Sequence, residues 1–244
     1  MLSREAFRRA MHLRASRTVA SRATGSSAAS ADFSGEIVEL YATLFEQHYH
    51  PHGPWAKIVK EAEARVPAQG GKILDLASGP GEPACLLASA IPGASVISSD
   101  FSQDMVDKAT QRSKDLDNVR CLHADAQDLS RFPTGTFDVV TCCYGYMFCP
   151  DPLQAMRESH RVLKPGGTLL ATYWTELAAM RACRTVMAAV APGAPPKPPP
   201  INPMALAEAG LVDSMLRLCG FDEVRISPDP PSSPPDLRRP GALL

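Results

Sequence analysis

From Lys72 onward, short apolar runs of β-type residues alternate with segments of helical pattern. Five runs predict strands: Ile73–Leu76, Ala94–Ile97, Val119–Leu122, Phe137–Val140 and Thr168–Tyr173. Helices are predicted near Glu82 to Ala90, Gln103 to Lys114 and Leu153 to Leu163. Because such alternation specifies parallel strands joined by crossover helices on both faces of a sheet, we expect an α/β, Rossmann-like, doubly wound fold with a mostly parallel sheet.

We place the core domain at residues 71–227, between N-terminal segments and a C-terminal tail. Residues 32–70 predict N-terminal cap helices, one after Ser34 and one from near Pro54 to Val66. Beyond the fifth strand we expect a helix to about Val190, a helix from about Leu211 that ends at Gly220, and a sixth strand over Phe221–Ile226. Six prolines in residues 228–244 exclude regular structure, so this part is predicted to be a Pro-rich tail.

The first 31 residues are rich in arginine, serine and alanine and contain one acid, Glu5. Residues 1–31 therefore have the composition of a transit peptide, and we expect a mitochondrial protein, with a plastid or a cytoplasmic location and a disordered tail as alternatives. Removing them takes six of 25 Lys and Arg residues and one of 26 Asp and Glu residues, which leaves a net charge of −6. An acidic body argues against a nucleic-acid partner.

The composition is that of a globular domain, with 45% apolar and 21% charged residues. No apolar run approaches the roughly 18 residues of a transmembrane helix, so no transmembrane segment is expected. The seven cysteines are scattered without a Cys-x-x-Cys pair and are expected to be reduced core residues. His48, His50 and His52 cluster without a thiolate or carboxylate at a matching spacing, and we expect no metal site.

A strand, a glycine turn and a helix follow one another in residues 73–84. Gly79 and Gly81 allow the backbone to bend tightly and to approach a ligand closely. The turn falls beyond the carboxyl end of the first strand, where open parallel sheets bind their ligands. We therefore predict a cofactor site at this turn.

Acidic residues lie at or just after the ends of three successive predicted strands: Asp75, Asp100 and Asp125. Asp100 suits the ribose hydroxyls of an adenosine, a role that a dinucleotide-binding site would use equally. Asp75 separates the two classes of site, because its carboxylate would repel a pyrophosphate and attract the ammonium and sulfonium of S-adenosylmethionine. For Asp75 or Asp125 alone, a helix N-cap is the structural alternative.

In these residues the chain resembles the class I S-adenosylmethionine-dependent methyltransferases, in the small-molecule branch that includes the ubiquinone and menaquinone biosynthesis enzymes. The matching motifs are Asp75 to Gly81, Asp100, Asp125 with Ala126, Phe137 to Val140, and Arg161 to Gly167. The resemblance covers roughly residues 36 to 226. It implies S-adenosyl-L-methionine as cofactor and a small-molecule methyl acceptor.

The resemblance also implies roles for single residues. Asp75 and the loop from Ala77 through Ser78 and Gly79 to Gly81 would face the methionine moiety. Asp100, next to Phe101, would bind the ribose, and Asp125 with Ala126 the adenine; Cys142 ends strand four beside the site. The first glycine of the family loop is Ala77 here, which is tolerable at a negative φ. The proline-rich tail stands where the family adds an antiparallel strand, so we expect a sheet that lacks or alters it.

Methyl transfer to an acceptor that is already nucleophilic mainly requires alignment and the exclusion of water. An acceptor that must lose a proton also needs a base. The candidate catalytic residues are Tyr41 and His48 before the core, and Tyr144 and Tyr146 after strand four. Residues 144–148 combine aromatic and thioether side chains, which suits a small or partly apolar acceptor.

Three classes of function remain open on the sequence. The first is a methyltransferase, and the second is an NAD(P)-dependent oxidoreductase, because both use a glycine loop and a ribose-binding acid. The third is a non-catalytic methyltransferase-like binding or assembly factor. Its support is the Pro-rich segments, which either bind a protein partner as extended helices or are disordered.

Overall fold

The computed structural model describes residues 53–68, 70–175 and 202–227. Along the chain they form α3 (Pro54–Glu63), β1 (Lys72–Leu76), α4 (Ala84–Ala90), β2 (Ser95–Asp100), α5 (Gln103–Arg112), β3 (Val119–His123), β4 (Phe137–Cys143), the 3-10 helix η2 (Tyr146–Phe148), α6 (Pro152–Val162), β5 (Leu163–Thr172) and α8 (Leu211–Leu218). The predicted leader, the first cap helix, the helix to Val190 and the Pro-rich tail lie outside the described residues.

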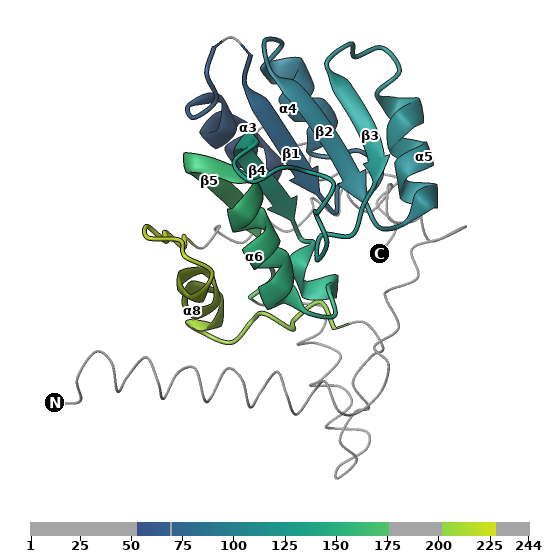
Figure 1. Cartoon of the computed structure of the whole chain (residues 1–244). Coiled ribbons are helices and arrows are strands. Elements are labelled where there is room, and N and C mark those ends of the chain that lie inside the picture. Colours follow the sequence, from purple (N-terminus) through teal and green to yellow (C-terminus); the bar gives the residue numbers. More distant parts are fainter. Residues whose placement is uncertain (1–52, 69, 176–201, 228–244) are drawn as a thin grey trace, which may run out of the picture.

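The five strands form one parallel sheet in the spatial order β3-β2-β1-β4-β5 (Figure 1). This confirms the predicted α/β, doubly wound, Rossmann-like fold. β1 lies in the centre, with Asp75 paired to Ser98 of β2 and to Thr141 of β4. Because parallel strands end at one edge, the segments that follow β1 to β4 meet at the carboxyl edge of the sheet. Residues 53–68, 70–175 and 202–227 contribute no antiparallel strand.

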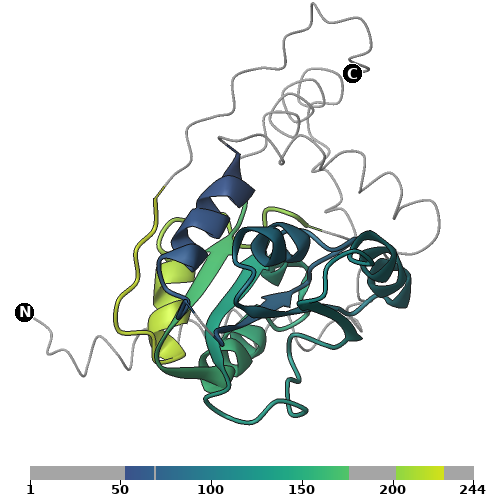
Figure 2. The same cartoon turned by 90° about the horizontal axis from the view of Figure 1, so that it is seen from above.

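Helices cover both faces of the sheet, as the two perpendicular views show (Figures 1 and 2). Successive residues of a strand point to opposite faces. Ile73 of β1 belongs to a cluster with Leu87 of α4, whereas Leu74 belongs to a cluster with Met156 of α6. Both β1 side chains are fully buried. The central strand is therefore apolar on both faces, as expected of a strand in a covered parallel sheet.

Local sequence signals set several helix ends. Ser102 caps α5 by accepting a hydrogen bond from the Met105 amide at 3.4 Å. Asp151 caps α6 in the same way, with Pro at the first helical position. After α8, Gly220 has a φ of +101°, and its amide and that of Phe221 bond back to the last turn. These bonds form a Schellman motif and confirm the predicted C-terminal glycine.

The predicted sixth strand over Phe221–Ile226 is wrong, because this described segment has no regular structure. The left-handed turn at Gly220 directs Phe221 against α6, where its ring meets His160 edge to face with centroids 4.9 Å apart. Phe221 therefore packs on a helix, and the segment does not join the sheet. A second difference lies in β5, which begins at Leu163 and contains the predicted turn at 164–167 as an irregularity in its pairing with β4.

The described helices include none that is long and apolar enough to cross a membrane. Among the same residues, no group of three or more His, Cys, Asp or Glu side chains is arranged to hold a metal ion. The cluster of His48, His50 and His52 lies outside the described residues.

Candidate functional site

The glycine turn after β1 is built from left-handed backbone. Gly79 and Gly81 have φ values of +56° and +101°, as glycine permits. Ala77 also has a positive φ, +50°, so the condition under which alanine is readily tolerated at this position, a negative φ, is not met. Such a conformation costs a non-glycine residue about 1 to 3 kcal/mol and persists where the surrounding structure imposes it. Here the neighbour is Gly145, where an added Cβ would lie 2.6 Å from the Cβ of Ala77.

Gly81 also allows close packing. A Cβ at this position would lie 3.2 Å from both the Cα and the Cβ of Ala109 on α5. The turn is further held from β2, since the Ser78 amide donates to the Ser99 carbonyl at 2.9 Å. The Ser98 hydroxyl bonds that of Ser78 at 2.8 Å. Two neighbouring elements therefore fix the loop that is predicted to contact the cofactor.

Asp75 is fully buried at the centre of the sheet. Thr141 of β4 donates a hydrogen bond to its Oδ1, and its Oδ2 has no hydrogen-bond partner. Burial raises the pKa of Asp75 to about 7, although the Thr141, Ser78 and Ala84 groups nearby lower it. The result is a carboxyl group whose negative charge is poorly compensated by the protein. A cationic ligand would provide the missing compensation.

Glu82 is the second buried acid of the turn. Its Oε1 accepts a hydrogen bond from the Arg112 guanidinium of α5 at 3.0 Å. Burial, followed by the charge of Asp75, raises the pKa of Glu82 to about 8. Two carboxyl groups that interact in this way do not ionise independently. At neutral pH the two carboxyl groups therefore keep much of their proton occupancy, and a positive charge placed beside them would favour their ionisation.

Asp100 connects the end of β2 to the glycine turn. Its Oδ2 accepts a hydrogen bond from the Gly79 amide and its Oδ1 one from the Ser102 amide, at 2.8 and 2.9 Å. Each carboxylate oxygen has a further lone pair, so the group can also accept from ribose hydroxyls. The next residue, Phe101, is 51% exposed, and its ring lies 5.8 Å from that of His123. An exposed aromatic ring beside Asp100 offers an apolar surface to a flat base.

Asp125 lies in the loop after β3. Its Oδ1 accepts from the backbone amide of Gln127 at 2.8 Å, and the Gln127 side-chain amide reaches both carboxylate oxygens at 3.1 and 3.3 Å. The neighbouring Ala126 is buried in the core cluster. Asp125 is therefore held as a turn-stabilising side chain next to a packed residue, and it retains lone pairs for an exocyclic amine.

The end of β4 closes the site on the other side. Cys142 is fully buried, with its Sγ 2.7 Å from where a Cβ on Gly145 would lie. Tyr144 has a φ of +55°, and its ring stacks on that of Trp174 with centroids 4.3 Å apart. Burial raises the pKa of Tyr144 to about 12. A phenol with this pKa is a weak base at neutral pH because it seldom ionises.

Tyr146 is turned into the core. Its hydroxyl bonds the Ser159 hydroxyl at 2.7 Å, and Ser159 in turn donates to the Ala155 carbonyl. Burial raises the pKa of Tyr146 well above its ordinary value. Among the candidate bases, the structure therefore gives Tyr146 a packing role. The other two candidates, Tyr41 and His48, lie outside the described residues.

Sequence reasoning did not single out Thr141, Gln127 or Glu82. The first two hydrogen-bond acids of the site, and Glu82 is itself a buried acid of the glycine turn. Thr141 is detectable only from the register of β4 against β1, which places it beside Asp75. The role of Glu82 cannot be read from nearby residues, because its ion-pair partner Arg112 lies 30 residues farther along the chain. Gln127 is the exception, because it follows Asp125 at the spacing of an Asx turn, which is a local signal.

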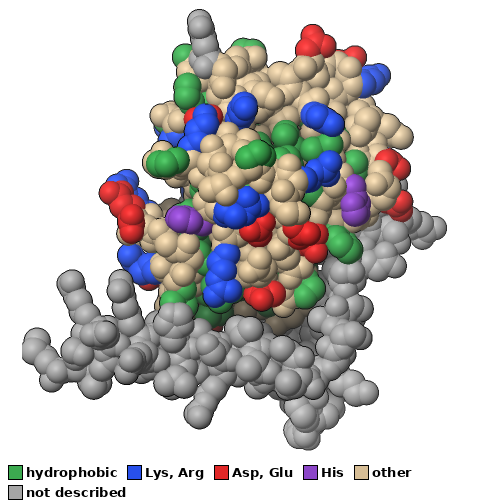
Figure 3. Space-filling model, in the orientation of Figure 1, with side chains coloured by type: hydrophobic (Ala, Val, Ile, Leu, Met, Phe, Trp, Pro, Cys, Tyr) green, Lys and Arg blue, Asp and Glu red, His purple; other side chains and the backbone are tan. Residues whose placement is uncertain are grey.

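Charge is mixed on the face that Figure 3 shows, where Lys and Arg lie among Asp and Glu over the described elements. A nucleic-acid-binding face would instead gather Lys and Arg in a patch or stripe. The coloured residues of this view form no such patch.

Comparison with known proteins agrees with this geometry. Residues 74–171 match the family model described as a methyltransferase domain. Demethylmenaquinone methyltransferase of Staphylococcus aureus (strain JH9) is 35% identical over 124 residues, which are 50% of this chain and 50% of that protein. The chain therefore spans about half the length of the curated relatives it matches.

Two solved structures show the likeness of fold. An S-adenosylmethionine-dependent methyltransferase from Thermotoga maritima has a TM-score of 0.53 at 19% identity, over 77% of this chain and 79% of that one. The cyclase SpnF has a TM-score of 0.51 at 27% identity, over 67% of this chain and 56% of that one. Residues 74–171 are therefore similar to a methyltransferase domain, and the sheet order and these two likenesses show a Rossmann-like fold of the kind found in S-adenosylmethionine-dependent methyltransferases.

Proposed function

We propose that the protein is an S-adenosylmethionine-dependent methyltransferase that acts on a small molecule by in-line methyl transfer. The observation that carries the proposal is the buried Oδ2 atom of Asp75, which has no hydrogen-bond partner. An isolated carboxylate in a protein interior is costly unless a cation or hydrogen-bond donors compensate it. The ammonium of S-adenosylmethionine would supply both a positive charge and donors next to the glycine turn.

The alternative dinucleotide site fits this charge distribution less well. A pyrophosphate would approach the same turn with two negative charges, and Asp75, Glu82 and Asp100 are all acids there. Burial raises the pKa of each of them, which indicates that the protein already tolerates negative charge poorly in this region. An oxidoreductase that binds NAD(P) would add to that cost, whereas a cationic cofactor would reduce it.

The remaining residues fit an adenosine. Asp100 would accept the ribose hydroxyls, and the exposed ring of Phe101 would lie along the base. Asp125, in the loop after the edge strand β3, would accept a hydrogen bond from the exocyclic amine of the adenine. When bound, S-adenosylmethionine supplies an electrophilic methyl group. The task of the chain is then to orient the acceptor, exclude water and hold the cofactor.

Two of the four candidate bases lie within the described residues. In residues 53–68, 70–175 and 202–227, the candidate bases Tyr144 and Tyr146 are buried phenols with raised pKa values. Neither phenol is therefore suited to accept a proton from the acceptor at neutral pH. Because one relative is named as a demethylmenaquinone methyltransferase, reduced quinones are the first acceptors to test.

Calorimetry with S-adenosylmethionine, S-adenosylhomocysteine and NAD tests the cofactor assignment. Binding of the first two without NAD is expected, and binding of NAD alone would overturn the proposal. Transfer of a radiolabelled methyl group from the cofactor to an acceptor extract then tests the activity. A protein that binds the cofactor but transfers no methyl group would favour the second candidate, a non-methylating role of the fold, which the likeness to the cyclase SpnF supports.

A further inference from the structure

The loop between β3 and β4 carries Asp125 and Ala126, the residues assigned to the adenine, and α6 holds this loop at two places. At the N-terminus of α6, Gln127 accepts a hydrogen bond from the Asp151 amide at 2.7 Å through its side-chain oxygen. Gln154 donates to the Gln127 carbonyl at 3.4 Å. The same Gln127 side chain donates to Asp125, so the orientation of the Asp125 carboxylate depends on the contact with α6.

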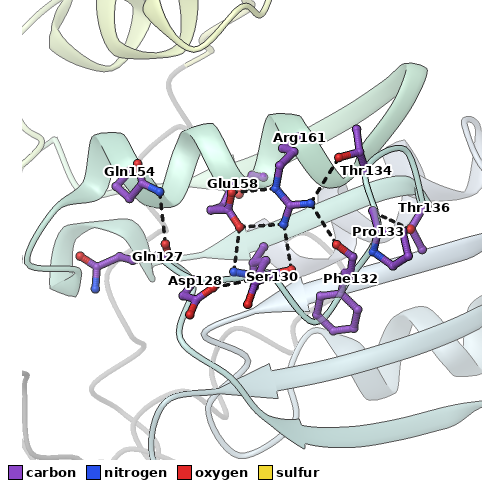
Figure 4. A network of polar contacts seen from close by, with 12 residues as sticks. Gln127, Asp128, Ser130, Phe132, Pro133, Thr134, Thr136, Gln154, Glu158 and Arg161 are labelled. Carbon is purple, nitrogen blue, oxygen red and sulfur yellow. Dashed lines mark hydrogen bonds and ion pairs between the residues drawn. The ribbon is translucent and has the colours of Figure 1, made fainter.

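The second attachment lies farther along α6 and consists of Glu158 and Arg161. Figure 4 shows their side chains directed into the loop. Arg161 donates to the carbonyls of Leu129 and Phe132 at 2.8 and 2.9 Å. Glu158 accepts from the Leu129 amide at 2.8 Å and forms a two-point ion pair with Arg161. One residue of the loop, Leu129, therefore has both of its backbone polar groups bound by this pair.

The ion pair of Glu158 and Arg161 is largely shielded from solvent, so its electrostatic attraction is only weakly screened. The side chains of Glu158 and Arg161 are 14% and 30% exposed. The ion pair lowers the pKa of Glu158 and raises that of Arg161, so both groups are charged at neutral pH. Bidentate guanidinium–carboxylate pairs fix geometry in a way that a lysine would not. Leu129 and Phe132 are also buried, so the loop is anchored through its backbone and its side chains.

We propose that Glu158 and Arg161 are positioning residues for recognition of the adenine base. By fixing Leu129 and Phe132 they hold the loop so that Asp125 and Ala126 stay at the carboxyl edge of the sheet. This inference rests on the proposed function, because it concerns the base of the same cofactor. The pair contacts the loop at Leu129 and Phe132, not at the residues assigned to the base. Its effect passes through the loop to Asp125.

The test compares two ligands that differ only at the base. S-Adenosylhomocysteine carries the exocyclic amine that Asp125 would accept, and S-inosylhomocysteine carries a carbonyl at that position. The full-length protein is expected to bind the adenosyl ligand at least about tenfold more tightly, as for a hydrogen bond to a charged partner. Asp125→Ala should abolish this preference. The ratio of the two affinities in that variant is the reference value for a complete loss of base recognition.

Arg161→Ala is then expected to reduce the preference towards that of Asp125→Ala while binding of both ligands remains measurable. Arg161→Lys keeps the charge without the fork and should give an intermediate ratio. Glu158→Gln, which keeps an acceptor for the Leu129 amide, should also be intermediate and provides a second variant if Arg161→Ala does not fold. Circular dichroism at the assay temperature establishes which variants are folded.

Lys164→Ala is the matched control. Lys164 pairs with Asp138 at 2.7 Å, and the two side chains are 39% and 12% exposed, close to the values of the Glu158–Arg161 pair. Asp138 also accepts from the Lys72 amide, at the opposite end of β1 from the site. The control should lower the melting temperature and leave the ligand ratio unchanged.

The outcomes separate the two proposals. If the wild-type protein binds neither ligand, the proposed function fails. If it prefers the adenosyl ligand and folded Arg161→Ala and Glu158→Gln retain the full preference, the positioning role fails while the proposed function stands. If Lys164→Ala changes the ratio as much as Arg161→Ala, the effect is one of general stability and the positioning role is refuted.

Discussion

Replacing Asp75 by asparagine should change how the stability of the protein depends on pH. In the ligand-free protein, burial raises the pKa of Asp75 from 3.8 to about 7. Between these values the folded state keeps the proton and the unfolded state has lost it. The contribution of this group to the free energy of unfolding is therefore present in full below pH 4 and is lost as the pH rises to about 7.

The magnitude follows from the two pKa values. The difference between 3.8 and about 7 corresponds to about 4 kcal/mol of stability lost over this interval. Asparagine matches the shape of the carboxyl group and still accepts from Thr141 through its oxygen. Asp75→Asn should therefore flatten the dependence and should be more stable than wild type at pH 8.

The same proton should be released when the cofactor binds, because the ammonium favours ionised Asp75. The measurement is calorimetry with S-adenosylmethionine at pH 6.5 in two buffers of different ionisation enthalpy, which counts the protons. With a pKa of about 7, we expect release approaching one proton. Free α-amino groups lose their own proton near pH 8, so measurements stay below roughly pH 7.5.

Two controls isolate the cause. Asp75→Asn should bind without this release, and so should 5′-methylthioadenosine with the wild-type protein, because it lacks the ammonium. The affinity of the wild-type protein for S-adenosylmethionine should fall about tenfold for each pH unit well below 7. Affinity that stays constant from pH 5.5 to 7.5, without proton release, would refute the assignment of Asp75 to the cation.

Further substitutions test other parts of the site. Asp100→Ala should weaken cofactor binding by about 1.5 to 3 kcal/mol, as for hydrogen bonds to a charged group, and unchanged affinity in calorimetry would remove it from the site. Gly81→Ala should lower the free energy of unfolding by more than about 1 kcal/mol, because of the positive φ of Gly81 and its contact with α5. The melting temperature should fall accordingly, and an unchanged melting temperature would contradict this. Tyr146→Phe should cost about 1 kcal/mol through the lost bond to Ser159 and retain turnover, whereas an inactive variant of normal stability would make Tyr146 the base. Residues 1–31 should be missing from the mature protein in mass spectrometry of the native cell, and an intact Met1 there would contradict import with cleavage.

Periodicity and turn chemistry predicted most of the core correctly, because these signals are local. The five strands, the crossover helices and Gly220 after α8 are each readable from a few consecutive residues. The error at Phe221–Ile226 has a non-local origin. An apolar run next to a turn fits a strand equally well, and only the position of His160 on α6 determines that Phe221 packs on a helix.

In the candidate site, too, some features were predicted from the sequence and others depend on contacts between distant residues. Asp75, Asp100 and Asp125 were predicted to lie together because parallel strands end at one edge. In the structure they lie at the carboxyl ends of three adjacent strands, Asp75 and Asp100 within β1 and β2 and Asp125 just after β3. The conformation of Ala77 was not predictable, because it depends on Gly145, which lies against it from beyond β4. The partners Thr141 and Arg112 were missed for the same reason: they come from other elements and become neighbours only through strand register and helix packing.

The order of the strands, combined with the proposed function, also predicts the side from which an acceptor would approach. In that proposal the base would lie near the ends of β2 and β3, with Phe101 and Asp125, and the ammonium near the end of β1, with Asp75. Because the cofactor would occupy the ends of β1, β2 and β3, we expect the acceptor to enter over the ends of the remaining strands, β4 and β5. At that side Tyr144 stacks on Trp174, and the Tyr144 amide donates to the Thr172 carbonyl, so that the strained φ of Tyr144 is held by β5. Since the ends of two strands carry this stacked pair, we expect it to form one flat wall of the acceptor site, which would favour planar acceptors over bulky ones.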